Sequence, residues 1–306
     1  MTNIKISSTD NVNELQVYIW EPENKPSAIL QISHGMQEHI GRYEEFATFL
    51  NSKGVLVIGN DHLGHGYSAK DENDLGYFGA NRSQTVVDDL HAVTLFAKEK
   101  YGNDVPFFLF GHSMGSFMAR RYLMTYGGEL TGAILSGTGS QPGLILSCGL
   151  LIANLTALIK GERHRSTLLK NMAFSSYNKR IKNPVSKSDW LSKDSEIVAK
   201  YDNDKFCTFD FTVNGYKTLF EAINFIQKNE NIERIPKNLP ILIMSGDEDP
   251  VGNYGKGVKM VYDRLKKSGL TNVDITLYEG GRHEMLNEVE REKVFDDIIM
   301  WINKHI

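Results

Sequence analysis

The stretch FGHSMGS, Phe110–Ser116, places a serine between two glycines with one residue on either side. The preceding run VPFFLF, Val105–Phe110, is apolar throughout and predicts a buried strand, and the residues after Gly115 have helical spacing. A Gly-x-Ser-x-Gly pattern at a strand–turn–helix junction is typical of a nucleophile elbow, because glycines allow the sharp turn that exposes the serine hydroxyl. Chance alone would supply the pattern in roughly one chain in six of this glycine content. The prediction that Ser113 is a nucleophile therefore depends on its setting.

Short apolar runs alternate with amphipathic helical stretches along most of the chain. The runs are almost continuously apolar, as expected of strands in a parallel sheet whose two faces are both covered. This alternation predicts an α/β fold with a mostly parallel, doubly wound sheet and right-handed crossovers. Besides Val105–Phe110, the predicted strands are Ala28–Ser33, Val55–Gly59, Gly132–Ser136, Ile241–Ser245 and Val273–Tyr278, and the predicted helices include Thr85–Lys100, Phe117–Tyr126, Tyr254–Lys267 and Val289–Lys304.

The alternation fails in the third quarter of the chain, where no strand is predicted. This part begins with the apolar stretch GLILSCGLLIANLTALI, Gly143–Ile159, and ends with a helical pattern, Tyr216–Gln227. We therefore expect a helical insertion at residues 141–239 between two parts of one sheet-containing core, residues 1–140 and 240–306. The apolar stretch is interrupted by polar residues and glycine, so it is marginal for a bilayer span.

Composition excludes several classes of protein. The 306 residues carry a net charge of −4 and no basic run stands out, which argues against a nucleic-acid partner. Two cysteines, Cys148 and Cys207, form neither a disulfide framework nor a metal knuckle, and we expect both to be small buried apolar residues. The N-terminal residues lack the pattern of a secretory signal, which indicates a cytoplasmic protein.

A serine nucleophile needs a histidine base and a carboxylate that orients the imidazole. His283 follows the last predicted strand, and SGDEDPVG, Ser245–Gly252, follows the strand before it. We predict Asp249 as the acid because it lies farthest into that loop, with Asp247 as the alternative. The order Ser113, Asp249, His283 is the chain order of α/β-hydrolases. Asp249 could instead start a turn, and His283 could cap the final helix.

Two backbone N–H groups should stabilise an oxyanion beside Ser113. Met114 follows the serine at the start of a helix, so its N–H is the first candidate donor. The second should come from the loop SHGMQEHIGRY, Ser33–Tyr43, which follows an earlier strand. We predict the Met36 N–H as that donor.

Three stretches resemble the monoacylglycerol lipase/lysophospholipase branch of the α/β-hydrolases, which is grouped with serine aminopeptidase-like hydrolases. They are HGMQEHIGRY (His34–Tyr43), NDHLGHGYS (Asn60–Ser68) and GHSMGS (Gly111–Ser116), and the acid and histidine loops also fit. The resemblance implies that the insertion is a lid over the active site. The family usually has a small residue and a glycine where this chain has Met36 and Gln37.

Two polar groups in these stretches need a separate interpretation. We expect Glu38, His39 and Arg42 to brace the oxyanion loop without acting on substrate. His62 and His65 could be interpreted as a metal pair, but no acidic residues complete a ligand set, so we expect a structural role.

The resemblance implies hydrolysis of a lipid ester, most simply a monoacylglycerol or lysophospholipid, through an acyl-enzyme and without metal or organic cofactor. The apolar stretch could line the acyl pocket through Leu150, Leu151 and Leu155 and touch a membrane surface, or it could be buried in the core of the lid. A small-ester carboxylesterase, an aminopeptidase, or a ligand-binding protein that kept the fold are the alternatives. The complete triad argues against the binding protein.

Overall fold

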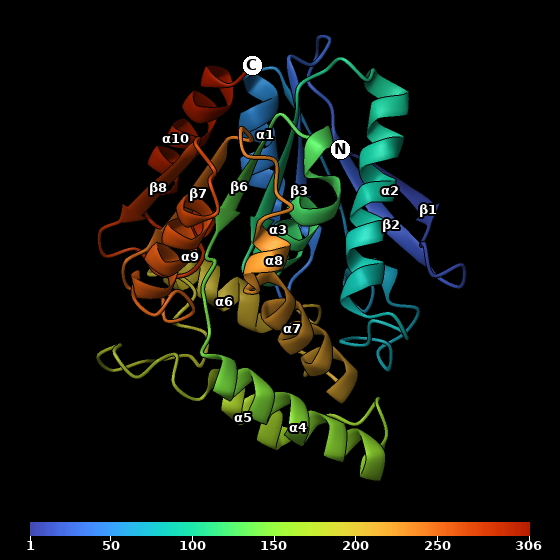
Figure 1. Cartoon of the computed structure of the whole chain (residues 1–306), viewed down its shortest axis with the longest axis vertical. Coiled ribbons are helices and arrows are strands. Elements are labelled where there is room, and N and C mark those ends of the chain that lie inside the picture. The colour runs from blue at the N-terminus through green and yellow to red at the C-terminus, as the bar shows by residue number, and fades with distance from the viewer.

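The computed structural model describes all 306 residues and contains one eight-stranded sheet (Figure 1). The strand order is β1-β2-β4-β3-β5-β6-β7-β8, and only the β1–β2 and β2–β4 pairs are antiparallel. All six predicted strands are present, so the predicted α/β sheet is confirmed. The bounds are β1 Thr2–Ser7, β2 Glu14–Trp20, β3 Ala28–Ser33, β4 Val55–Asn60, β5 Phe107–His112, β6 Gly132–Ser136, β7 Ile241–Gly246 and β8 Val273–Tyr278.

The N-terminal hairpin of β1 and β2 was not predicted from the sequence. β1 is an edge strand, and only Ile4 and Ile6 of it are partly buried against the core. Its apolar signal is therefore short and weak. Antiparallel pairing with β2 holds β1 in the sheet, with Thr2 opposite Ile19 and Ser7 opposite Glu14.

Helices cover both faces of the sheet, as a doubly wound arrangement requires. Along β3 and β5 the apolar side chains alternate between two cores, so that Ile29 and Leu109 belong to one and Leu30 and Phe110 to the other. The first core includes residues of α2 (Ser83–Tyr101), α3 (Met114–Tyr126) and α9 (Lys256–Lys267), and the second includes residues of α1 (Glu44–Ser52) and α10 (Arg291–Lys304).

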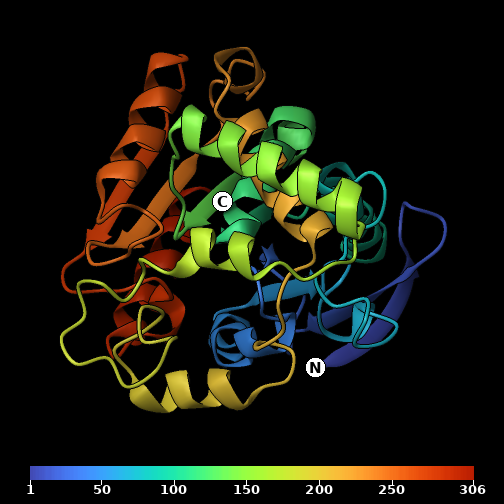
Figure 2. The same ribbon diagram turned by 90° about the horizontal axis from the view of Figure 1, so that it is seen from below.

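Five helices and no strand of the sheet lie between β6 and β7. Figures 1 and 2 show this segment across one end of the core, with α4 running over α7. The helices are α4 (Gly143–Lys160), α5 (Thr167–Phe174), α6 (Ser195–Asn203), α7 (Val213–Ile226) and α8 (Asn229–Ile232). We refer to residues 141–239 as the lid segment.

Helix α4 is the apolar stretch noted in the sequence. By length and composition alone, this helix could cross a membrane, and 17% of its residues are buried inside the protein. The side chains of Leu146 and Ala153 are buried, together with Gly149, on the side that faces the rest of the protein. Cys148, on the same helix, is exposed, so the expectation that both cysteines are buried was wrong for Cys148 and correct for Cys207.

Candidate active site

Ser113 stands at the turn between β5 and α3 with a backbone conformation that a non-glycine residue rarely adopts. Its φ is 52° and its ψ is −120°. The turn is held by a 2.9 Å hydrogen bond from Ser113 N–H to the Ser136 carbonyl on the adjacent β6. Strain of this kind persists only where the surroundings over-determine it, and it is common at functional sites.

The glycines of the motif are required by close approach of the backbone. A Cβ atom at Gly115 would lie 2.0 Å from the carbonyl oxygen of Ser33 on β3, and one at Gly111 would lie 2.5 Å from the carbonyl oxygen of Gly115. Only glycine therefore lets α3 start so close to β3, which places Ser113 at the carboxyl edge of the sheet.

The structure brings His283 and Asp249 together. Asp249 follows β7, His283 follows β8, and His283 Nδ1 lies 3.0 Å from Asp249 Oδ2 with both side chains buried. Asp249 also accepts hydrogen bonds from Ser245 Oγ at 3.0 Å and from the Val251 N–H at 2.8 Å. These contacts fix the direction of the carboxylate.

Asp247, the alternative acid, lies elsewhere. It is exposed, and its carboxylate accepts a 2.8 Å hydrogen bond from the Gly280 N–H, which holds the loop after β8. Asp249 is therefore the carboxylate that the fold places against the imidazole.

The electrostatics of His283 suit a base. Burial lowers the pKa of His283, but the Asp249 carboxylate outweighs burial, so the pKa of the imidazole is raised above its usual value. The Nε2 atom is buried and has no hydrogen-bond partner in the protein. Because Ser113 and His283 line the same cavity, this nitrogen remains available to a hydroxyl there.

The loop after β3 lies against Ser113. A Cβ at Gly35 would lie 3.1 Å from Ser113 Cβ, so the backbone passes the serine at close range. Met36 lines the cavity and its N–H donates no hydrogen bond within the protein. Met114 is the first residue of α3, so its N–H has no acceptor inside the helix. Neither predicted oxyanion donor therefore has a hydrogen-bond acceptor within the protein, and their role stays a prediction.

A buried ion network connects this loop to the histidine loop. Arg42 donates to Glu38 Oε2 at 2.9 Å and, with two nitrogens, to Glu284 at 2.8 and 2.7 Å. Glu38 in turn accepts a hydrogen bond from the Gly35 N–H and one from Tyr43 Oη at 3.0 Å. Since Glu284 follows His283 directly, one guanidinium holds the loop of Met36 and the loop of His283 in fixed relation.

The pKa values of the two buried carboxylates are shifted in opposite directions. Burial raises the pKa of Glu38 more than the Arg42 guanidinium lowers it. Glu284, also buried, has two hydrogen bonds from Arg42, and these bring its pKa down to about 2. His39, which we expected in this network, instead pairs with Asp204 of the lid segment at 2.9 Å.

His34, His62 and His65 form a separate buried cluster behind the loop. The His62 N–H donates to His34 Nε2 at 2.9 Å, and His62 Nε2 lies 3.0 Å from Ser33 Oγ. Burial lowers the pKa of His62 to about 3 and that of His65 to about 4, so both rings are neutral at physiological pH. They contact one another and neighbouring aromatic rings, in the structural arrangement that we expected.

A cavity of about 440 Å³ opens above Ser113 and is bounded by both the core and the lid segment. Helix α4 contributes Ile145, Leu146 and Gly149 to its wall, and α7 contributes Leu219, Phe220 and Ile223. A wall of this kind suits an apolar chain, and the polar groups of the site stand at its base.

Leu150, Leu151 and Leu155, the predicted acyl-binding residues of α4, do not line this cavity. Leu151 and Leu155 are 60% and 51% exposed, and Leu150 is half-buried. A helix that is apolar on all sides has no sequence signal for the face that packs inward. The prediction therefore chose residues of α4 that lie outside the cavity wall.

The lid segment also supplies aromatic side chains that sequence analysis missed. The ring of Trp190 lies 4.9 Å from that of His283, and Tyr177 packs edge-on against Trp190 at 4.7 Å. The Trp190 carbonyl accepts a 3.4 Å hydrogen bond from the His283 N–H. A tryptophan within a strongly charged stretch was the one available signal.

Three features define the protein as an α/β-hydrolase. They are the serine on a strained strand–helix turn, the buried carboxylate–imidazole pair and the mostly parallel sheet. Residues 24–290 match the family described as serine aminopeptidase, S33, and the chain belongs to this family.

Relatives of known identity span almost the whole chain. The chain is 30% identical to monoglyceride lipase of Homo sapiens, over 93% of this chain and 85% of that protein. It is 27% identical to monoacylglycerol lipase of Mycolicibacterium smegmatis, over 94% and 92% of the two chains. Among solved structures, a highly thermostable carboxyl esterase from Bacillus coagulans in complex with glycerol is 32% identical, with a TM-score of 0.92 and coverage of 99% and 98%.

Proposed function

We propose that this protein is a serine ester hydrolase that cleaves monoacylglycerols to a fatty acid and glycerol. Ser113 is the nucleophile, His283 is the general base, and Asp249 orients and stabilises the imidazole. The observation that carries the proposal is the 3.0 Å contact of Asp249 with His283 Nδ1, which leaves Nε2 free in the cavity that Ser113 lines.

The reaction follows from these positions. His283 Nε2 takes the Ser113 Oγ proton while Oγ bonds to the ester carbonyl carbon. The Met36 and Met114 N–H groups stabilise the oxyanion that forms. The imidazolium then gives its proton to the departing alkoxide, which leaves as glycerol. Water, deprotonated by the same His283, attacks the acyl-enzyme and releases the fatty acid.

The substrate class is supported by the cavity and by the relatives. The wall formed by α4 and α7 is apolar, whereas Ser113, His283 and the network of Glu38 and Glu284 lie at the base. An ester with one long apolar chain and a small polar alcohol matches that division. Two relatives are monoacylglycerol or monoglyceride lipases, and one is a carboxyl esterase bound to glycerol.

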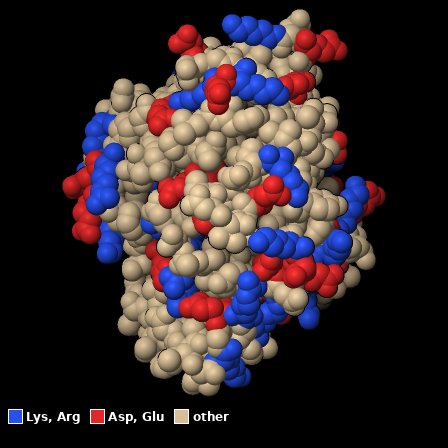
Figure 3. Space-filling model, turned by 90° about the vertical axis from the view of Figure 1, so that its right-hand side faces the viewer, with Lys and Arg blue, Asp and Glu red and all other residues tan.

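The exposed side of α4 is proposed to contact a lipid surface, with the protein cytoplasmic and peripheral to the membrane. Leu144, Leu151 and Leu158 are 77%, 60% and 83% exposed, although they are large and apolar. Figure 3 shows the lower end of the molecule, where the lid segment lies, with a tan area beside blue Lys and Arg side chains. Lys160 is the last residue of the helix and Arg163 follows it, and both would attract anionic headgroups.

Replacement of Ser113 by alanine tests the assignment. We expect Ser113→Ala to abolish monoacylglycerol hydrolysis and labelling by a fluorophosphonate probe, because the variant lacks the proposed nucleophile. Labelling that persists in this variant would contradict the proposal. Monoacylglycerols, lysophospholipids, short nitrophenyl esters and aminoacyl amides, assayed side by side, distinguish the lipase from a small-ester esterase or a peptidase.

A further inference from the structure

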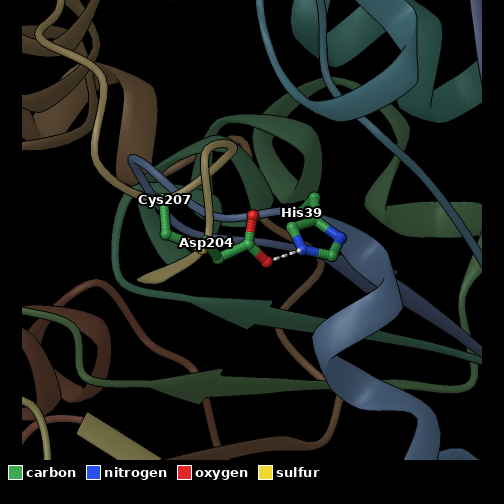
Figure 4. Close-up of side chains that lie close together, drawn as sticks. All are labelled: His39, Asp204 and Cys207. Atoms are coloured by element: carbon green, nitrogen blue, oxygen red, sulfur yellow. Dashed lines mark hydrogen bonds and ion pairs between the residues drawn. The ribbon is translucent and has the colours of Figure 1, made fainter. Parts of the chain in front are cut away.

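Three metal-ligating side chains meet outside the candidate active site. His39 Nε2 lies 2.9 Å from Asp204 Oδ2, and the ligand atoms of His39, Asp204 and Cys207 all lie within 4.8 Å of one another (Figure 4). We propose that these three residues bind a divalent transition-metal ion, with Zn²⁺ as the expected occupant.

The donor set determines the class of metal. An imidazole nitrogen, a carboxylate oxygen and a thiolate sulfur together suit Zn²⁺, whereas Mg²⁺ and Ca²⁺ prefer oxygen ligands only. Bonds of roughly 2.0–2.3 Å place tetrahedral ligand atoms about 3.3–3.8 Å apart. The three atoms therefore need side-chain shifts of about 1 Å or less, and no movement of the fold.

Local structure holds the two lid ligands in place. The Cys207 N–H donates to the Asp204 carbonyl at 2.9 Å, which forms a turn that keeps the two residues close together. The Phe206 N–H donates to Asp204 Oδ1 at 2.8 Å, so one carboxylate oxygen is fixed and the other is directed at His39. The ring of Phe206 packs edge-on against His39 at 5.8 Å and limits its rotation.

The proposed metal site is partly exposed to solvent, and the charges of its ligands match the charge of the ion. Cys207 is buried, while the Asp204 side chain is 31% exposed, so water can supply a fourth ligand. On binding, the Cys207 thiol releases its proton to solvent and the His39–Asp204 contact is replaced by two metal bonds. The carboxylate and thiolate then neutralise both charges of the ion.

The position of the site gives it a consequence for the lid segment. His39 belongs to the loop that carries Met36, and Asp204 and Cys207 connect α6 to α7. The same two segments already meet where Gln37 Nε2 donates to the Phe209 carbonyl. A bound ion would therefore fasten the lid segment to the predicted oxyanion loop.

Cobalt provides a direct optical test, because a Co²⁺–thiolate bond gives a near-ultraviolet charge-transfer band. Protein stripped with a chelator should bind one equivalent of Co²⁺ with this band, and Zn²⁺ should displace the ion and remove the band. Cys207→Ser should lose the band, whereas Cys148→Ser, which removes the exposed thiol of α4, should keep it. Absence of the band in the wild-type protein, or its survival in Cys207→Ser, would overturn the proposal.

Variants at the other two ligands test the complete set. We expect His39→Gln and Asp204→Asn each to weaken Zn²⁺ binding at least tenfold in competition with a chelating dye. Zn²⁺ should raise the Tm of the wild-type protein and of Cys148→Ser, but not that of His39→Gln. Equal affinity and an equal rise in Tm in all four proteins would mean that the ion binds elsewhere.

Discussion

His283 can accept a proton only while its imidazole is neutral, so the residue that sets its pKa also sets the pH range of activity. Burial alone would lower the pKa of His283, and the Asp249 carboxylate reverses that effect. Raising the pKa of a base strengthens it but requires a higher pH for the neutral form. The rate should therefore rise with pH through the raised pKa of His283.

The variant Asp249→Asn separates the effect of burial on the pKa of His283 from the effect of the carboxylate. The amide cannot stabilise the imidazolium and favours the wrong tautomer, so we expect kcat to fall by about 10³–10⁴. The inflection of the remaining pH–rate profile should move to lower pH, because the charge that raised the pKa of His283 is gone. Asp247→Asn, at the exposed carboxylate of the same loop, is the control and should leave the inflection in place. An unchanged inflection in Asp249→Asn would contradict the assigned contact.

Arg42 is the residue whose loss should most disturb the site without touching Ser113. Arg42→Gln leaves the buried carboxylates of Glu38 and Glu284 without their shared partner, so we expect the free energy of unfolding to fall by about 3–5 kcal/mol. Arg163→Gln removes a guanidinium that is 54% exposed and paired with Asp74, which should cost about 1 kcal/mol or less. Denaturant unfolding of both variants measures the difference, and similar losses would contradict a dominant role for the network.

At the scale of elements, short apolar runs in the sequence predict the strands of the sheet. Ala28–Ser33 is buried at every position, and its predicted bounds match β3. The carboxyl ends of parallel strands lie at the same edge of a sheet, so the loops of Ser113, Asp249 and His283 meet there. This is why the candidate triad could be predicted from the sequence. β1 was missed because an edge strand buries few side chains, and Trp190 was missed because its partner is 93 positions away in the chain.

Helix α4 shows what the sequence could not decide. Its composition predicted an apolar helix in the insertion, but the inward face depends on packing against α7, which is a tertiary contact. The two faces should therefore have different functions, and the helix offers a matched pair of residues to separate them. Ile145 and Leu151 are 58% and 60% exposed, yet only Ile145 lines the cavity.

Serine at each of these positions should affect different steps. Ile145→Ser should lower kcat/KM on dissolved long-chain esters about 5- to 30-fold, from loss of about 1–2 kcal/mol of apolar contact, and spare short-chain esters. Leu151→Ser should leave dissolved substrates unaffected and weaken co-sedimentation with anionic vesicles. If both variants lose long-chain activity equally, α4 does not have two distinct faces.

At the scale of the whole molecule, the beginning of the lid segment lies beside the end of α7. Gln227, at the end of α7, accepts from Ser140 Oγ at 2.8 Å and from the Gln141 N–H at 2.7 Å, and donates to the Gln141 carbonyl at 3.0 Å. Arg120 of α3 lies beneath, fully buried, and donates to the Gly139 carbonyl at 3.0 Å. One glutamine side chain therefore joins the beginning of the lid segment to the end of α7.

Loss of this junction should loosen the lid segment without unfolding the core. Gln227→Ala removes three hydrogen bonds between the end of α7 and the beginning of the lid segment. A loss of about 1–3 kcal/mol should speed hydrogen exchange about 5- to 150-fold where opening of the segment limits it. We expect that increase in α4 and α5, with β5 and β6 unchanged. Gln84→Ala, which removes a glutamine contact within α2 and to Arg121, is the matched control and should leave α4 protected. Faster exchange in β5 and β6 as well would mean that the lid segment and the core open together, because the junction would then stabilise the whole fold rather than the lid alone.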